Sequence, residues 1–211
     1  MPAAARAGGE RPPYHELAPR PPSEGPVDLT RVLPGEGPLE LDVGFGRGRS
    51  LLERARVAPE VRLVGVEVRP KWVVKLAERL EREALAERVR IWAADVRDLL
   101  PRCGPDGCLD RVFVHFPDPW WKKRHARRRV VDGAFVAQVA RLLRPGGQLF
   151  VQTDVEDRAL AYRDTVGADG RFELAGDHGF VPANPFGARS NREVRVEADG
   201  LPVWRLLATR R

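Results

Sequence analysis

A glycine-rich turn near the start of the chain has the residues to bind a ligand through its backbone. The turn Asp42-Val43-Gly44-Phe45-Gly46-Arg47-Gly48 follows a short apolar run and precedes a helical pattern. Glycines at alternate positions let a ligand approach where side chains would collide, so Gly44, Gly46 and Gly48 are candidate ligand-binding residues. Arg49 stands where a dinucleotide-binding turn has a small residue, which argues against a pyrophosphate-containing ligand.

Three acidic residues, Asp42, Glu67 and Asp95, each end or follow an apolar run that predicts a strand. The carboxyl ends of parallel strands meet in one crevice, so these carboxylates should converge there. Glu67 could accept hydrogen bonds from ribose hydroxyls, Asp95 from an adenine amine, and Asp42 could attract a cationic group. Any one of them could instead be a solvated carboxylate or a helix cap. Together they predict S-adenosylmethionine, which has adenine, ribose and a positive charge but no phosphate.

The fourth apolar run leads into His115-Phe116-Pro117-Asp118-Pro119-Trp120-Trp121. The two prolines around Asp118 restrict the backbone, so its carboxylate is held in place. A fixed carboxylate can accept the N1–H and N2–H donors of guanine. Trp120 and Trp121 could stack on an extruded base, although at least one of them could equally be a core residue.

Six fixed cations stand in the eight positions immediately after the two tryptophans. A solvated helix start is the ordinary interpretation of a charge run, but like charges without acids repel one another unless phosphates neutralise them. We therefore expect RNA to bind here, with the histidine in an orienting or phosphate-binding role. The candidate RNA-binding residues are Lys122, Lys123, Arg124, His125, Arg127, Arg128 and Arg129.

These residues closely resemble the Phe-Pro-Asp-Pro-Trp-x-Lys-x-x-His signature of the bacterial tRNA (guanine-N7)-methyltransferases, and the likeness extends over most of residues 39–211. The resemblance implies a class I methyltransferase fold that binds S-adenosylmethionine and methylates a variable-loop guanine, guanine 46, of tRNA. It implies that Asp118 is catalytic and that Lys122 and Asp154 contact the substrate. The acids that it carries over to the cofactor site are Asp42, Glu67, Asp95 and Asp118.

One segment departs from the family pattern. The family usually has Thr-Lys-Phe-Glu or Thr-Lys-Tyr-Glu near its end, whereas this chain has Ser190-Asn191-Arg192-Glu193. The hydroxyl and the carboxylate are retained, but the lysine and the aromatic residue are not. We expect Ser190, Asn191, Arg192 and Glu193 to bind substrate, with Glu193 and Asp118 on opposite sides of the same guanine.

The pattern of short β-rich runs alternating with helical stretches predicts an α/β, Rossmann-like fold, a mostly parallel doubly wound sheet with helices on both faces. The late signals are weaker and predict a helix over 156–165, strands over 171–174 and 203–209, and a long loop over 176–189. The predicted strands span 39–43, 62–67, 89–93, 109–116 and 148–153, and the main helices span 50–57, 71–85 and 134–143.

The composition indicates an ordinary soluble protein of 211 residues, with 43% hydrophobic and 31% charged residues. Residues 1–38 hold nine of the 19 prolines and little apolar periodicity, which predicts a flexible tail before a methyltransferase domain at 39–211. No apolar run reaches the ~18 residues of a membrane helix, and no signal-peptide core is present. We therefore expect a cytoplasmic protein without a membrane partner.

The two cysteines, Cys103 and Cys108, have no second pair to complete a zinc site, so we expect free thiols and no metal. The net charge of +6 favours a polyanionic partner, here tRNA, and no obligate protein partner is expected. Two alternatives stay open. One is methylation of an exocyclic amine, although only Pro119 fits the usual Asp/Asn-Pro-Pro-aromatic loop. The other is a non-catalytic RNA-binding module, which would be expected to lose the cofactor acids.

Overall fold

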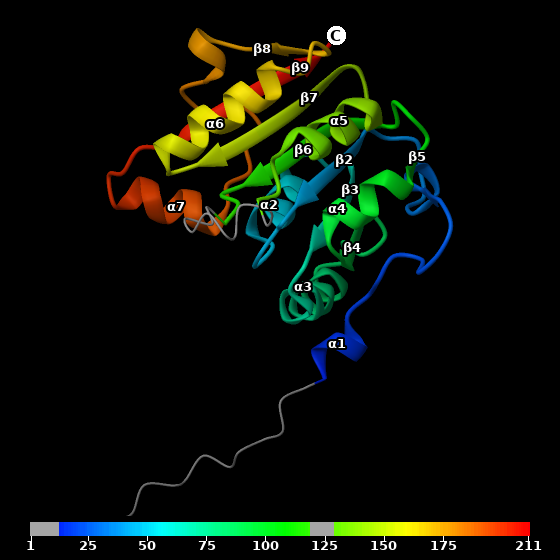
Figure 1. Ribbon diagram of the computed structural model, residues 1–211. Helices are drawn as coiled ribbons and strands as arrows, with labels where there is room; N and C mark the ends of the chain where they lie inside the picture. Colours follow the sequence, from blue (N-terminus) through cyan, green and yellow to red (C-terminus); the bar gives the residue numbers. More distant parts are fainter. Residues whose placement is uncertain (1–12, 119–128) are drawn as a thin grey trace, which may run out of the picture.

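The computed structural model describes residues 13–118 and 129–211, and within them seven strands form a central sheet (Figure 1). The strand order is β4-β3-β2-β6-β7-β9-β8, and the first five of these strands are parallel. The last two, β9 and β8, are antiparallel to their neighbours. The bounds are β2 Leu39–Val43, β3 Arg62–Glu67, β4 Val89–Ala93, β6 Leu109–His115, β7 Leu143–Thr153, β8 Phe172–Leu174 and β9 Trp204–Arg210. The predicted mostly parallel sheet is confirmed.

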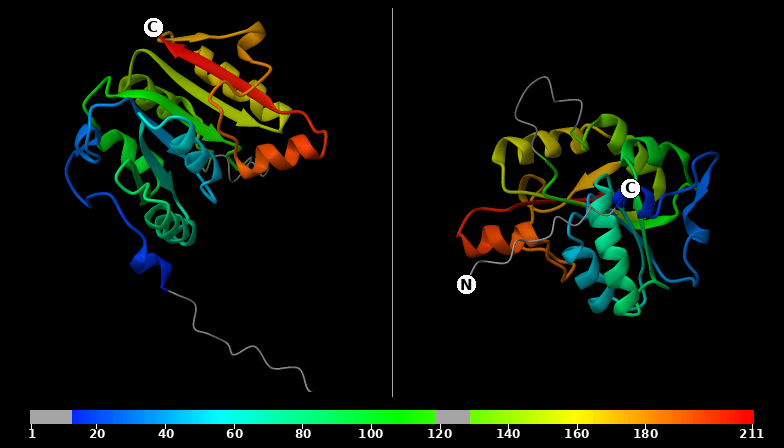
Figure 2. Two further views of the ribbon diagram at one scale, coloured as in Figure 1. Left: turned by 180° about the vertical axis from the view of Figure 1, so that it is seen from behind. Right: turned by 90° about the horizontal axis from the view of Figure 1, so that it is seen from below.

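Helices cover both faces of the sheet, as the pattern predicts (Figure 2). Helices α2 (Arg49–Val57) and α3 (Pro70–Arg82) pack on one face through a shared apolar cluster. Helices α5 (Gly133–Leu142) and α6 (Glu156–Gly167) pack on the other face with the short helix α4 (Val96–Leu99). Because strand β2 is covered on both faces, all five of its residues are buried.

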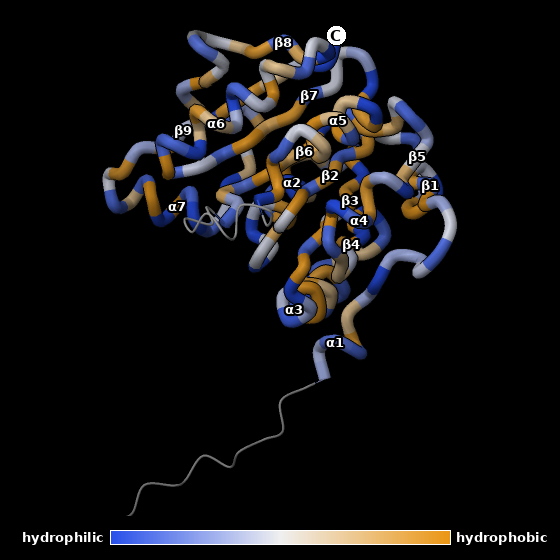
Figure 3. The backbone as a smooth tube through the Cα atoms, in the orientation of Figure 1, coloured by the Kyte–Doolittle hydropathy of each residue, from blue (hydrophilic) through white to orange (hydrophobic). Residues whose placement is uncertain are grey.

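Local sequence explains where the main helices begin. Pro70 occupies the first turn of α3, where its missing N–H has no intrahelical partner to lose, and Val73, Leu76 and Leu80 form the buried stripe of that helix. Helix α5 begins after Asp132, whose carboxylate accepts a hydrogen bond from the Phe135 N–H at 2.9 Å. Figure 3 shows the apolar residues concentrated along the central strands and the inner sides of the helices.

Several parts of the described chain differ from the prediction. Helix α7 (Asn191–Ala198) was not expected, and it lies on the same side of the sheet as α2. Its glutamate Glu193 reaches inward to strands β7 and β9. The predicted 176–189 loop is confirmed apart from a 3₁₀ turn at Asp177–Gly179, and further 3₁₀ turns lie at Leu29–Arg31 and Leu100–Arg102.

The predicted flexible tail over 1–38 is wrong for residues 13–38, while residues 1–12 lie outside the described chain. Helix α1 (Tyr14–Leu17) contacts α3, and strand β1 (Val27–Asp28) pairs with β5 (Cys103–Gly104). Val27, Leu29 and Leu33 are buried in the main core cluster. These apolar residues stand in a short segment between Pro26 and Pro34 that has no regular helical or strand period, so only tertiary packing reveals that they are buried.

No helix within residues 13–118 and 129–211 combines the length and the apolar character needed to cross a bilayer.

Candidate active site at the carboxyl ends of the parallel strands

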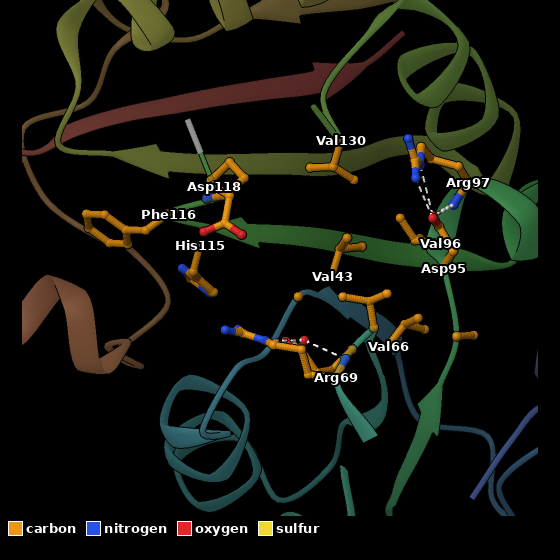
Figure 4. Close-up of a pocket in the computed structure, with 15 residues that line it drawn as sticks. Val43, Val66, Arg69, Asp95, Val96, Arg97, His115, Phe116, Asp118 and Val130 are labelled. Atoms are coloured by element: carbon orange, nitrogen blue, oxygen red, sulfur yellow. Dashed lines mark hydrogen bonds and ion pairs between the residues drawn. The ribbon is translucent and has the colours of Figure 1, made fainter. Parts of the chain in front are cut away.

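A cavity of about 340 Å³ lies where the parallel strands end (Figure 4). Its walls are largely apolar, with Val43, Val66 and Val96 among them, and its volume falls in the range of small-molecule sites. Its carboxylates come from the end of strand β3 (Glu67) and from the loops after β4 (Asp95) and β6 (Asp118). Asp118 and His115 lie at one end of the cavity, and Asp95 lies at the other beside Arg97.

Glu67 is hydrogen-bonded to the glycine-rich turn and to Arg69. Its Oε2 accepts the Gly46 N–H at 2.9 Å, and its Oε1 accepts the backbone N–H and the Nε of Arg69 at 3.0 and 2.9 Å. The Glu67 hydrogen bond raises the pKa of the Arg69 guanidinium above its ordinary value. The Glu67 side chain is only 3% exposed, whereas that of Arg69 is 59% exposed. Arg69 can therefore release Glu67 to another hydrogen-bond donor at small desolvation cost.

Asp95 has a similar arrangement on the next strand. It caps helix α4, and its Oδ1 accepts the backbone N–H and the Nε of Arg97, each at 3.0 Å. Hydrogen bonding from Arg97 holds the pKa of the Asp95 carboxyl below its ordinary value. Glu67 and Asp95 thus each accept hydrogen bonds from an arginine, and hydroxyl or amine donors of a ligand can replace those arginine donors. This donor set and the apolar walls fit an adenosyl group.

Three of the predicted cofactor contacts, Asp42, Gly46 and Gly48, do not line this cavity. Asp42 is buried, and its Oδ2 accepts the Ser50 hydroxyl at 2.9 Å beneath the turn. Burial raises its pKa, and its Oδ1 has no hydrogen-bond partner among the described residues. Gly48 has φ +77°, and a Cβ there would lie 2.5 Å from Leu76 Cδ2, so this glycine lets the turn pack on α3. Gly44 and Gly46 do line cavities.

A second cavity of about 480 Å³ adjoins the first. Gly44, His115 and Asp118 line both cavities. These residues therefore form the boundary between the two cavities. Phe116 in this region adopts φ +49°, an unusual backbone conformation for a bulky residue. The second cavity also brings together Asp154, Ser190, Asn191 and Arg192, which the sequence analysis predicts as substrate contacts.

Glu193 was predicted to contact the substrate, but it lines neither of the two cavities. It is fully buried, and its carboxylate accepts hydrogen bonds from Gln152 Nε2 at 2.6 Å and from Arg205 Nη2 at 3.2 Å. Ser190 caps helix α7, since its Oγ accepts the Glu193 N–H at 3.1 Å. The spacing Ser-x-x-Glu is that of a capping box, and this signal could have predicted the helix.

The predicted RNA contacts Lys122, Lys123, Arg124, His125, Arg127 and Arg128 lie outside the described residues, together with Trp120 and Trp121. Arg129 is described and is half-buried. Three polar residues that line the first cavity were not proposed as site residues by the sequence analysis, namely His115, Arg69 and Arg97. Only the position of His115 immediately before the Phe-Pro-Asp-Pro motif could have indicated one of them.

No cluster of three potential metal ligands occurs within the described residues. Both cysteines are free thiols. Burial raises the pKa of Cys103 and of Cys108 to about 11, so both thiols are protonated at neutral pH.

The fold is shared with known methyltransferases. The 16S rRNA methyltransferase KamB superposes with a TM-score of 0.59 and 19% identity over 82% of this chain and 87% of its own. A 30S ribosomal A1408 methyltransferase from an uncultured bacterium has a TM-score of 0.59 and 14% identity, over 92% and 99% of the two chains. At these identities the likeness concerns the fold.

Sequence relatives are much closer. The family model described as "Putative methyltransferase" matches residues 36–206. The tRNA (guanine-N(7)-)-methyltransferase of Marinobacter nauticus is 38% identical over 184 residues, which cover 87% of this chain and 77% of the relative. That of Myxococcus xanthus is 36% identical over 182 residues, which cover 86% and 88%. The chain therefore belongs to the tRNA (guanine-N7)-methyltransferase family.

Proposed function

We propose that this protein transfers the methyl group of S-adenosylmethionine to N7 of a guanine in tRNA, the variable-loop guanine 46, in the cytoplasm. The observation that carries the proposal is the position of Asp118, which lines both the carboxylate-walled cavity and the second cavity beside it. A residue on that boundary can contact a base in one cavity while the methyl donor lies in the other. Family membership supports the same reaction.

S-adenosylmethionine, when bound, supplies an electrophilic methyl group on a cationic sulfur. Glu67 and Asp95 would hold its ribose and its adenine amine, exchanging the guanidinium contacts that they now make with Arg69 and Arg97. Val66 and Val96 supply apolar walls for the base. Because these walls exclude water, they also favour transfer of a methyl group from a cation to a neutral nucleophile.

The substrate base needs to be held rather than deprotonated. Guanine presents N1–H and N2–H donors on one edge and the N7 lone pair on the other. Asp118, acting as an acceptor, can bind the donor edge and leave N7 free. N7 has no proton to lose, so no general base is required, and catalysis rests on positioning.

Cations near the second cavity support a polyanionic substrate. Arg47 lines that cavity, and its guanidinium carbon lies 5.2 Å from the centroid of the Trp72 ring. Lys71 and Lys75 lie 5.4 and 6.0 Å from the same centroid. Lys71 lies in the first turn of helix α3, where the helix dipole disfavours positive charge, and that turn has no acidic residue to compensate. RNA phosphates would offset that repulsion.

The reaction is tested by incubating total tRNA with the protein and labelled S-adenosylmethionine, followed by nucleoside mass spectrometry. We expect 7-methylguanosine. A methylated exocyclic amine would support the alternative enzyme, and RNA binding without any product would support a binding module. The variant Asp118→Asn should lower turnover at least tenfold with cofactor affinity within twofold, since it places an amide donor against guanine donors. Asp157→Asn, exposed in helix α6, is the matched control.

A further inference from the structure

A buried chain of hydrogen bonds connects helix α7 to the boundary between the two cavities. His115 Nδ1 and Gln152 Oε1 are 2.6 Å apart, and Gln152 Nε2 lies 2.6 Å from Glu193 Oε1. His115 and Gln152 are register partners on the neighbouring strands β6 and β7. Gln152 and Glu193 are both fully buried, so water does not compete for these contacts.

The chemistry of Glu193 sets the direction of every hydrogen bond in this chain. Glu193 forms an ion pair with Arg205 at 3.2 Å, so it is a carboxylate and can only accept. Gln152 must therefore turn its amide nitrogen toward Glu193, because the flipped amide would place oxygen against oxygen. Its Oε1 then faces His115, and an acceptor there requires His115 to donate from Nδ1.

The His115 ring is also held in orientation by aromatic neighbours. It stacks on Phe113 with centroids 5.8 Å apart and an interplanar angle of 7°, and the Phe150 ring meets it edge-on at 6.1 Å. Its Nε2 has no hydrogen-bond partner among the described residues and is not enclosed. The ring lines both cavities, and Figure 4 shows it beside Asp118. In the Nδ1–H tautomer, His115 presents an unprotonated Nε2 at the boundary.

We propose that Glu193 and Gln152 are positioning residues that fix His115 in its Nδ1–H tautomer, so that Nε2 accepts a hydrogen bond from a guanine N–H donor. This inference rests on the proposed function and adds a substrate contact to it. The tautomer matters for the nucleophile. A proton on Nε2 could hydrogen-bond to guanine N7 and occupy the lone pair that must attack the methyl group. An unprotonated Nε2 cannot bind N7, and it joins Asp118 in favouring the orientation that leaves N7 free.

The tautomer can be measured without RNA. Long-range ¹H–¹⁵N spectra of protein labelled at its four histidines distinguish a protonated Nδ1 from a protonated Nε2, and loss of one signal set in His115→Asn assigns His115. We expect the Nδ1–H pattern in the wild type. Gln152→Met removes the acceptor at similar volume and should convert His115 to the Nε2–H form. An Nε2–H pattern in the wild type would overturn the proposal.

Two substitutions of His115 separate a substrate contact from a structural one. The Asn side chain places its amide near the position of Nδ1, and the Gln side chain places it near the position of Nε2. We expect His115→Gln to keep kcat/KM for tRNA within threefold of the wild type and His115→Asn to lower it at least tenfold. The reverse order would show that only the bond to Gln152 matters and would overturn the proposal. This comparison stands even if Gln152→Met does not fold.

Failure of the proposed function is a separate result. If the wild type forms no 7-methylguanosine, the proposed function fails, whatever the histidine spectra show. If the wild type forms 7-methylguanosine but His115 carries its proton on Nε2, only the role assigned to His115 fails.

Discussion

Arg192, in the first turn of helix α7, donates from Nε to Oδ2 of Asp154, just beyond strand β7, at 3.0 Å. The two residues are 38 positions apart in the sequence, and both line the second cavity. The Asp154 side chain is 16% exposed and that of Arg192 is 50% exposed. The ion pair therefore joins two predicted substrate contacts into one unit on the cavity wall.

If the two residues act as a unit, the effects of their substitutions on the KM for tRNA should not be additive. We expect Arg192→Met and Asp154→Asn each to raise the KM for tRNA about two- to fivefold, the range for a partly exposed pair of about 0.5–1 kcal/mol. The double variant should be no worse than the worse single variant. Steady-state kinetics check this, with Arg163→Met as the control, since the Arg163–Asp164 pair lies outside both active-site cavities. Fully additive effects would contradict the coupling.

Glu67 should be the most important cofactor residue among the described acids. Glu67→Gln removes the negative charge that pairs with Arg69. It also places an amide N–H donor where the carboxylate now accepts N–H donors of Gly46 and Arg69. Unsatisfied buried groups cost about 1–3 kcal/mol, so the Kd for S-adenosylmethionine should rise about tenfold or more. Calorimetry measures it, with Glu78→Gln on the exposed side of helix α3 as control. An unchanged Kd would remove Glu67 from the cofactor site.

The glycines of the turn should separate into a ligand contact and a packing contact. Gly44 and Gly48 have φ of +72° and +77°, so alanine strains the backbone at both positions, by about 1–2 kcal/mol. Only at Gly48 does the added Cβ collide with Leu76. Gly48→Ala should therefore lower the free energy of unfolding by about 1–3 kcal/mol more than Gly44→Ala. Gly44→Ala should instead lower cofactor affinity more than Gly48→Ala does. Identical unfolding curves for the two variants would contradict this division.

Asp42 should destabilise the fold as the pH rises. Burial raises its pKa above the ordinary 3.8. The folded state then binds more protons than the unfolded state just above pH 3.8, so this group's contribution to stability falls with rising pH in that window. Asp42→Asn should be more stable than the wild type at pH 7, and the difference should vanish near pH 3.5. Denaturant unfolding at several pH values measures it, and a difference independent of pH would contradict this account.

Arg205 should be required for folding stability because it neutralises a fully buried carboxylate. Arg205→Met leaves Glu193 without its cationic partner, and breaking a buried pair costs about 3–5 kcal/mol. Arg195→Met is the matched control in helix α7, because its 3.7 Å contact with Asp199 is exposed. It should change stability by less than about 1 kcal/mol. Similar losses in thermal denaturation of both variants would argue against an ionised Glu193.

Much of the fold could be predicted because its signals are local. Runs such as 62–67 and 89–93 are mostly apolar and buried because helices cover both faces of a parallel sheet, and glycines and prolines mark the turns between them. The placement of Glu67, Asp95 and Asp118 around one cavity follows from that topology alone, because each of them ends or follows a parallel strand. The motif around Asp118 indicated the family.

The tertiary structure decided which polar groups face the cavities and which face one another. Ser190 to Glu193 is one short motif in the sequence, yet helix α7 turns Arg192 toward Asp154 and Glu193 into the core beside Arg205. The burial of Leu29 and the link from Gln152 to His115 likewise join segments far apart in the chain. Residue type determines that a carboxylate needs a donor, but the choice of donor depends on distances that only the folded chain sets.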